Sequence, residues 1–111
     1  MLILIIGSAP DALEAQTLKR ELFGGIVAIN NAWKIRNDWD FCIFPDDFPK
    51  NRRPTNNKDK KLIRSNQYVP IQNKYGGFVY SGGTMSFTAG YWALGYFKPC
   101  LLYTSDAADE S

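Results

Sequence analysis

The stretch Leu2-Ile3-Leu4-Ile5-Ile6-Gly7-Ser8-Ala9-Pro10-Asp11 decides the fold. Its first half is a continuous apolar run rich in β-branched residues, which is typical of a strand buried on both faces of a parallel sheet. In the turn that follows, Ser8 precedes Asp11 by three residues and Pro10 lies between them, a pattern found where helices begin. The pattern therefore predicts a strand over 2–6, a tight turn, and a helix over 11–23.

Two further apolar runs are predicted to be strands of the same sheet. They cover residues 26–29 and 41–44, and each is followed by a polar turn. A short helical turn is expected over 32–38. Strands that alternate with helical segments favour an α/β fold, which we expect to be an open, doubly wound, Rossmann-like and mostly parallel sheet.

The second half of the chain is less regular. Residues 50–67 are predicted to be a basic loop insertion, because residues 50–64 hold seven Lys and Arg side chains against the single Asp59. We expect a short edge strand over 68–71, where Pro70 excludes a central position, and another strand over 78–81. From Thr84 the apolar spacing becomes helical, with one face formed by Met85, Ala89, Trp92, Ala93, Tyr96 and Phe97.

Residues 100–111 resemble translated sequencing adapter. Back-translated with one codon each, Cys100–Asp109 matches the adapter of transposase-based libraries. We therefore expect residues 1–99 to be an incomplete nucleotide-binding domain, truncated at its C-terminus, with 101–103 filling a strand position by accident and 105–111 unpacked. The chain has 13 basic and 11 acidic residues, net +2; three acids lie in 106–110, so residues 1–99 carry 13 basic and 8 acidic side chains, net +5.

Composition places the chain among globular proteins, with 45% hydrophobic and 22% charged residues. No apolar stretch approaches the ~18–20 residues of a membrane span. Outside the adapter-like segment Cys42 is the only cysteine, which excludes an internal disulfide and favours a reducing compartment. A cytoplasmic location is therefore expected.

Polar turns follow three of the predicted strands. They contain Gly7, Ser8 and Pro10 in the first, Asn30 in the second, and Ser81, Gly82, Gly83 and Thr84 in the third. In a parallel sheet such turns meet at one edge, where backbone N–H groups and hydroxyls can bind phosphate or ribose. Each turn taken alone fits a plain helix cap or chain reversal equally well.

The segments LIIGSAPDAL, VAINNAW and YSGGTMSFTAGYWALGYFKPCLL resemble motifs of the family 42 bacterial sialyltransferases. The archaeal 6-hydroxymethylpterin diphosphokinase-like proteins have a similar Rossmann-like layout. The resemblance implies that the cytidine monophosphate part of a donor is held by Gly7, Ser8, Pro10, Asn30, Ser81 and Gly82, with Gly83 and Thr84 adjacent. Two departures concern the first turn, since Ser8 replaces the family's asparagine and Ala9 its second glycine. The family's catalytic histidine lies beyond the equivalent of Pro99, and this chain has no histidine, so the catalytic residues stay unassigned.

Charged residues leave three interpretations open. Asp46 and Asp47 could hold Mg²⁺ or stabilise the turn between two prolines, and the turn is favoured. Arg52 and Arg53 could contact phosphates of a nucleotide. Nucleic acid is not expected as a partner, because residues 50–64 contain no aromatic side chain on which a base could stack.

Three hypotheses follow for function. The first is a nucleotide-binding enzyme, a nucleotide-sugar-dependent glycosyltransferase similar to the sialyltransferases, of which this chain would be an inactive fragment. The second is a diphosphokinase-like phosphotransferase that requires magnesium. The third is a non-enzymatic basic binding module that uses residues 50–64.

Overall fold

The computed structural model describes residues 2–7, 15–54, 61–75, 85–97 and 101–105. Five parallel strands form one sheet in the order β4-β3-β2-β1-β5. The strands are β1 (Leu2–Ile6), β2 (Gly25–Ile29), β3 (Phe41–Ile43), β4 (Lys61–Ile63) and β5 (Leu101–Ser105). The chain builds the sheet outward from β1 to β4 and then returns to place β5 on the other side of β1. The parallel α/β fold expected from the apolar runs is thus confirmed.

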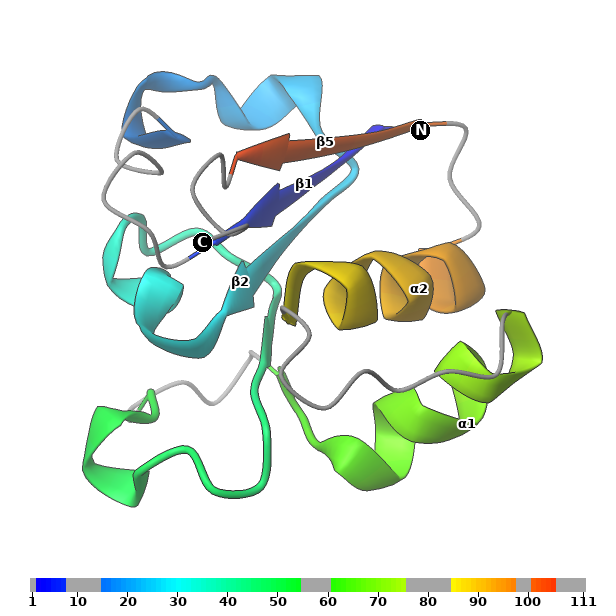
Figure 1. The fold of residues 1–111 in the computed structure, drawn as a ribbon. Helices are drawn as coiled ribbons and strands as arrows, with labels where there is room; N and C mark the ends of the chain where they lie inside the picture. Colours follow the sequence, from blue (N-terminus) through cyan, green and yellow to red (C-terminus); the bar gives the residue numbers. More distant parts are fainter. Residues whose placement is uncertain (1, 8–14, 55–60, 76–84, 98–100, 106–111) are drawn as a thin grey trace.

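Chain segments cover both faces of the sheet (Figure 1). One face carries two α-helices, which lie side by side, α1 (Ser65–Tyr75) and α2 (Met85–Phe97). The other face carries short 3₁₀ helices, η2 (Arg20–Leu22) and η3 (Asn30–Lys34), and a third, η4 (Lys50–Arg52), follows β3. No helix of the described residues is long and apolar enough to cross a membrane.

Alternation along the strands divides the core into two layers. Leu4, Ile6, Ile26, Ala28 and Cys42 pack with Phe23, Trp39, Phe44 and Phe48 on the 3₁₀ side. Ile3, Ile5, Val27, Ile29, Phe41, Ile43 and Ile63 pack with Tyr68, Ala89, Trp92 and Ala93 on the helix side. Because both strand faces are covered, the strand sequences are continuously apolar rather than alternating.

The helix predicted over 11–23 is not continuous. Residues 15–17 and η2 are separate 3₁₀ turns, and residues 8–14 lie outside the described part of the chain. The Leu22 side chain is 57% exposed, whereas the Phe23 side chain is buried. The Phe23 side chain fills the core because the chain turns into β2 directly afterwards, with the Gly24 N–H donating to the Leu2 carbonyl over 2.8 Å.

Two predictions for residues 50–71 are wrong. The basic loop insertion contains β4, whose Ile63 side chain is buried, and the first residues of α1. The edge strand expected over 68–71 is instead part of α1, with Pro70 inside the helix. Tertiary packing overrides local preference here, since Tyr68 is buried against the sheet and Ile71 packs so closely on Gly95 of α2 that a Cβ there would clash.

The helix over 85–97 is confirmed, with Ala89, Trp92 and Ala93 buried against the sheet. Tyr96, expected on the same face, is 50% exposed and stacks on Trp92 with ring centroids 5.0 Å apart. A strand does occupy residues 101–103 and extends to 105, paired with β1. The prediction that Ser105 is unpacked is wrong for its backbone, because Ser105 pairs with Ile6 of β1. Residues 106–111 and the strand expected over 78–81 lie outside the described residues.

Arg36 ties the segment between β1 and β2 to the segment between β2 and β3. Its Nη1 donates to the carbonyls of Ala15 and Leu18, at 2.9 and 2.8 Å. Its Nε and Nη2 each donate to a carboxylate oxygen of Asp38 over 2.7 Å. These charge-assisted hydrogen bonds lower the pKa of the Asp38 carboxyl.

We expect the substitution Asp38→Asn to destabilise the protein at pH 7 but not in strong acid. A carboxyl whose folded-state pKa is lowered adds stability above its unfolded pKa of about 3.9, and that stability is lost as pH falls through the lower, folded value. Urea unfolding at pH 7 and below pH 3 checks this: the gap between wild type and variant should close in acid. Glu21→Gln, at an exposed residue of η2, is the control. A gap that is independent of pH would contradict the role of the Asp38 charge.

Candidate ligand-binding edge

The carboxyl ends of the parallel strands meet at one edge of the sheet, which we call the carboxyl edge and which is formed by Gly7, Asn30, Phe44 and Arg64. The register fixes their order. Ile6 pairs with Ala28, so Gly7 comes level with the last residue of β2, next to Asn30. Ile29 pairs with Ile43 and Ile43 with Ile63, so Asn30, Phe44 and Arg64 follow one another across the edge. Ligands of open α/β sheets bind at such an edge.

Asn30 is the most unusual residue of this edge. Its backbone has φ 55°, and it is the only non-glycine residue with positive φ in the described chain. Its Oδ1 atom is buried and has no hydrogen-bond partner among the described residues. A buried acceptor without a donor costs about 1–3 kcal/mol, and left-handed backbone about 1–2 kcal/mol for most residues, though asparagine tolerates it better. Both costs fall on one residue, at the edge where open α/β sheets in general bind ligands.

The backbone of Asn30 is held by the buried Cys42. The Cys42 Sγ donates to the Asn30 carbonyl oxygen over 3.4 Å. Burial raises the pKa of the Cys42 thiol to about 12, so the group keeps the proton that it donates. Cys42 therefore has a structural role behind the carboxyl edge.

Asp46 links the turn after β3 to the start of α1. Its Oδ2 accepts a hydrogen bond from the Ser65 hydroxyl over 2.7 Å, which joins this turn to the first residue of α1. Burial raises the pKa of the Tyr68 hydroxyl, and the negative charges of Asp46 and Asp47 raise it further. The described residues contain no group of three or more acidic, Cys or His side chains that could hold a metal ion. Magnesium binding by Asp46 and Asp47 stays a prediction.

Arg53 is engaged within its own loop. Its Nε and Nη2 donate to the Phe48 carbonyl at 3.0 and 2.6 Å, and Nη2 also donates to the Asp46 carbonyl at 3.1 Å. Its guanidinium lies 4.7 Å from the ring centroid of Phe44, and that of Arg64 lies 5.5 Å from the same ring. The Arg53 guanidinium thus stabilises the turn, and few of its N–H groups are left to donate to a phosphate.

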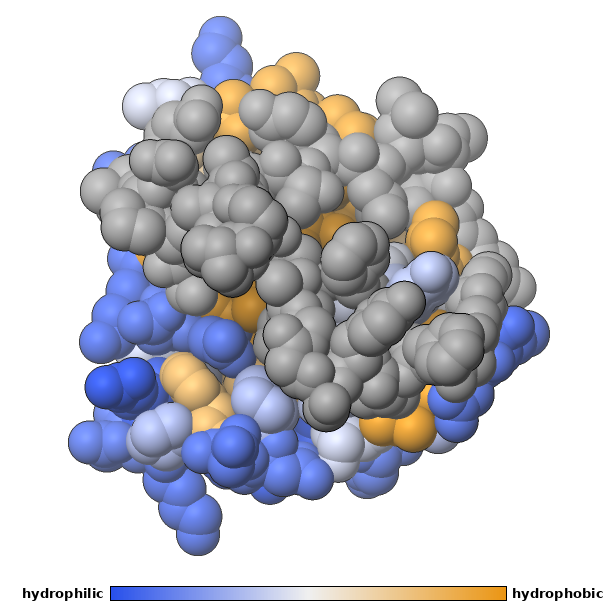
Figure 2. All heavy atoms as spheres, viewed as in Figure 1, coloured by the Kyte–Doolittle hydropathy of each residue, from blue (hydrophilic) through white to orange (hydrophobic). Residues whose placement is uncertain are grey.

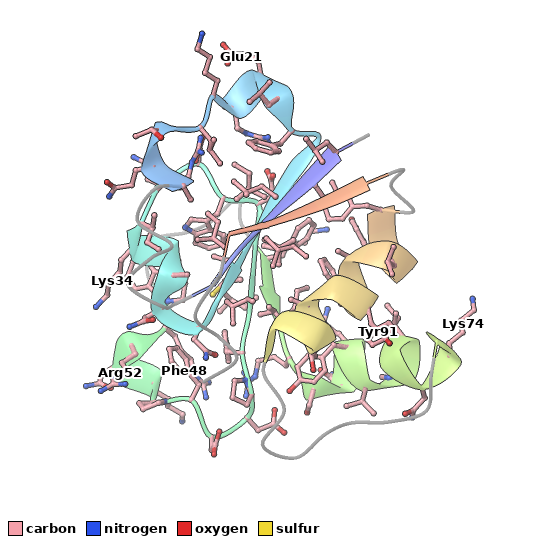
Figure 3. All side chains as sticks on the ribbon, turned by 45° about the horizontal axis from the view of Figure 1, so that its top comes forward. Glu21, Lys34, Phe48, Arg52, Lys74 and Tyr91 are labelled. Atoms are coloured by element: carbon pink, nitrogen blue, oxygen red, sulfur yellow. The ribbon has the colours of Figure 1, made fainter. Side chains whose placement is uncertain are left out.

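Arg52 differs from its neighbour. Its side chain is exposed and extends from η4 toward solvent, on the side of the molecule to which Lys34 also extends (Figure 3). Its backbone carbonyl accepts a hydrogen bond from Trp33 Nε1 over 2.9 Å. Of the two arginines predicted to contact phosphate, the structure leaves Arg52 available.

Two of the predicted site residues, Gly7 and Asn30, are brought together by the strand register. Ser8, Pro10, Ser81, Gly82, Gly83 and Thr84 lie outside the described residues. The predictions missed Arg64 and Ser65, which reach the carboxyl edge because β4 leads directly into α1. Predicting them required recognising Lys61–Ile63 as a strand, and its three residues carry too little apolar signal for that.

In comparisons with known proteins, no family model, no curated protein and no solved structure matches the chain. Inference about function therefore rests on the parallel α/β sheet, its carboxyl edge and the sequence motifs.

Proposed function

We propose that the chain binds a nucleotide at the carboxyl edge of a Rossmann-like sheet, as part of a nucleotide-sugar-dependent glycosyltransferase. The observation that carries the proposal is Asn30, whose buried Oδ1 lacks a donor among the described residues and whose backbone is left-handed. Residues in uncommon backbone conformations that bury an unsatisfied group concentrate at functional sites. A ligand that supplies an N–H or O–H would satisfy this oxygen.

The chemistry of the acceptor favours a nucleotide over a simple anion. Phosphate or sulfate would present oxygens to Oδ1, which accepts hydrogen bonds but cannot donate them. A ribose hydroxyl or the amino group of a base does donate. The strand order adds support, because it reverses at β1, and in open parallel sheets the reversal marks the crevice for ligands. The glycosyltransferase reaction itself rests on the resemblance of the three sequence segments to sialyltransferase motifs.

The test uses Asn30→Gly. Glycine accepts φ 55° and removes the amide, so this variant should be at least as stable as wild type. Loss of one hydrogen bond of about 1–1.5 kcal/mol should weaken nucleotide binding about tenfold. Calorimetric titration with the 5′-monophosphates of cytidine, uridine, guanosine and adenosine, with inorganic phosphate as the reference ligand, checks this. Asn31→Ala is the matched control and should bind like wild type.

Two results would count against the proposal in different ways. If none of the four nucleotides binds the wild-type chain, nucleotide binding is wrong. If one binds with equal affinity to wild type and Asn30→Gly, the nucleotide site exists but does not include Asn30.

A further inference from the structure

The basic segment 50–64 has no aromatic residue, which by itself argues against nucleic acid as a partner. In the folded chain, however, an aromatic ring from another segment lies beside these basic residues. Trp33 of η3 donates its indole N–H to the carbonyl of Arg52 in η4, over 2.9 Å. A tryptophan and an arginine nineteen residues apart are thereby fixed beside each other.

The surroundings of this pair are cationic. The Lys34 Nζ lies 5.6 Å from the centroid of the Trp33 ring, and its side chain is exposed. Lys50 and Arg52 are also exposed, on the two ends of η4. We call these four residues, Trp33, Lys34, Lys50 and Arg52, the Trp33 surface; its three cations are exposed, whereas Trp33 is half-buried and packs in part against the core of the 3₁₀ side. In Figure 2 the part of the molecule that holds η3 and η4 is largely hydrophilic.

Asp38, the acidic residue nearest to Lys34 in sequence, forms a salt bridge with Arg36. The Asp46 carboxylate accepts a hydrogen bond from Ser65 at the start of α1, and Asp47 lies three residues before Lys50. Glu21 extends from the opposite end of the molecule in Figure 3. The positive charge of the Trp33 surface is therefore not neutralised by an ion pair with a described residue.

We propose that the Trp33 surface binds single-stranded nucleic acid, with Trp33 stacking on a base and with Lys34, Lys50 and Arg52 contacting consecutive phosphates. Sequence-tolerant binding of single strands combines these two elements, an aromatic platform and a row of cations. The hydrogen bond from Nε1 to the Arg52 carbonyl fixes the plane of the indole before a base arrives. This function is separate from nucleotide binding at Asn30 and does not depend on it.

The experiment measures fluorescence anisotropy of a labelled oligothymidylate of about 12 nucleotides, within the span of known single-strand sites. Wild type should bind, and the affinity should fall steeply between about 50 and 200 mM salt. Lys34→Ala and Arg52→Ala should each weaken binding several-fold and reduce the slope of log Kd against log salt by about one. Lys74→Ala removes the same charge from the far end of α1 and should change the slope least.

Tryptophan fluorescence gives a second, independent readout. Trp39 and Trp92 are 4% and 2% exposed, so quenching by a stacked base reports on Trp33. The quenching should vanish in Trp33→Phe, while anisotropy still reports residual binding through the cations. Circular dichroism establishes that each variant is folded.

Three outcomes would overturn the proposal. The first is no anisotropy change at about 50 mM salt. The second is equal weakening by Lys74→Ala and Arg52→Ala, which would mean binding to overall charge. The third is that the oligonucleotide binds without quenching Trp33 and that the protein is retained equally well on vesicles of anionic lipid. That result would mean that the surface binds polyanions in general.

Discussion

Replacing Phe44 by alanine is expected to lower the free energy of unfolding by about 3–5 kcal/mol. Phe44 is fully buried directly after β3, and its ring lies 5.5 Å from that of Phe48. Its removal leaves a cavity on the 3₁₀ side of the sheet and also takes away the ring over which the guanidiniums of Arg53 and Arg64 lie. Chemical denaturation followed by circular dichroism gives the value.

Two further variants keep this prediction testable if Phe44→Ala does not fold. Phe44→Leu retains most of the volume and should lose about 1 kcal/mol. Leu22→Ala, at a side chain that is 57% exposed, should change stability by less than about 0.5 kcal/mol. If Phe44→Leu and Leu22→Ala proved equally harmless, the 3₁₀ side would not be a packed layer.

The corresponding residue on the helix side is Trp92, and Trp92→Ala should cost about 3–5 kcal/mol. The ring is buried between α2 and the sheet, with its centroid 5.0 Å from that of Phe41 in an edge-to-face arrangement. Loss of the indole would remove one of three ring contacts between α2 and Phe41 of β3 and would empty a large volume. Urea unfolding monitored by far-ultraviolet circular dichroism measures the change, because the tryptophan signal itself is altered.

Tyr96→Ala is the matched control for Trp92. Tyr96 stacks on the same indole but is half exposed, so its loss should cost much less, about 0.5–1.5 kcal/mol for the aromatic pair. If Tyr96→Ala destabilised the protein as much as Trp92→Ala, the helix side would not have its core at Trp92. Comparing the Phe44 and Trp92 variants tests the two faces of the sheet separately.

The strands β1, β2 and β3 could be predicted because each is a run of apolar residues that the sheet buries on both faces. The run Ile26–Ile29 is short, rich in β-branched residues and preceded by two glycines, which favours a strand covered on both faces. β4 could not be predicted in the same way. It has three residues at a sheet edge, with Lys61 exposed, and its pairing with β3 depends on residues twenty positions away.

Helix α1 illustrates a second limit. Val69 and Ile71 are β-branched and Pro70 lacks an N–H, so local preference opposes a helix there. Packing on α2 and burial of Tyr68 outweigh that preference, and both are tertiary contacts that periodicity does not reveal. The same reason applies to the carboxyl edge: Asn30 could be predicted from its place after a strand, but its left-handed backbone and its oxygen without a partner among the described residues could not.

The position of β1 between β2 and β5 has a consequence for how the protein forms. β2 begins at residue 25, whereas β5 begins at residue 101 and pairs along the whole of β1. During synthesis the second edge of β1 therefore stays unpaired until residues 101–105 have been made. Such distant pairing slows folding and leaves an apolar strand edge open to other chains meanwhile. Refolding yield should accordingly fall as protein concentration rises, even where the folded state is stable.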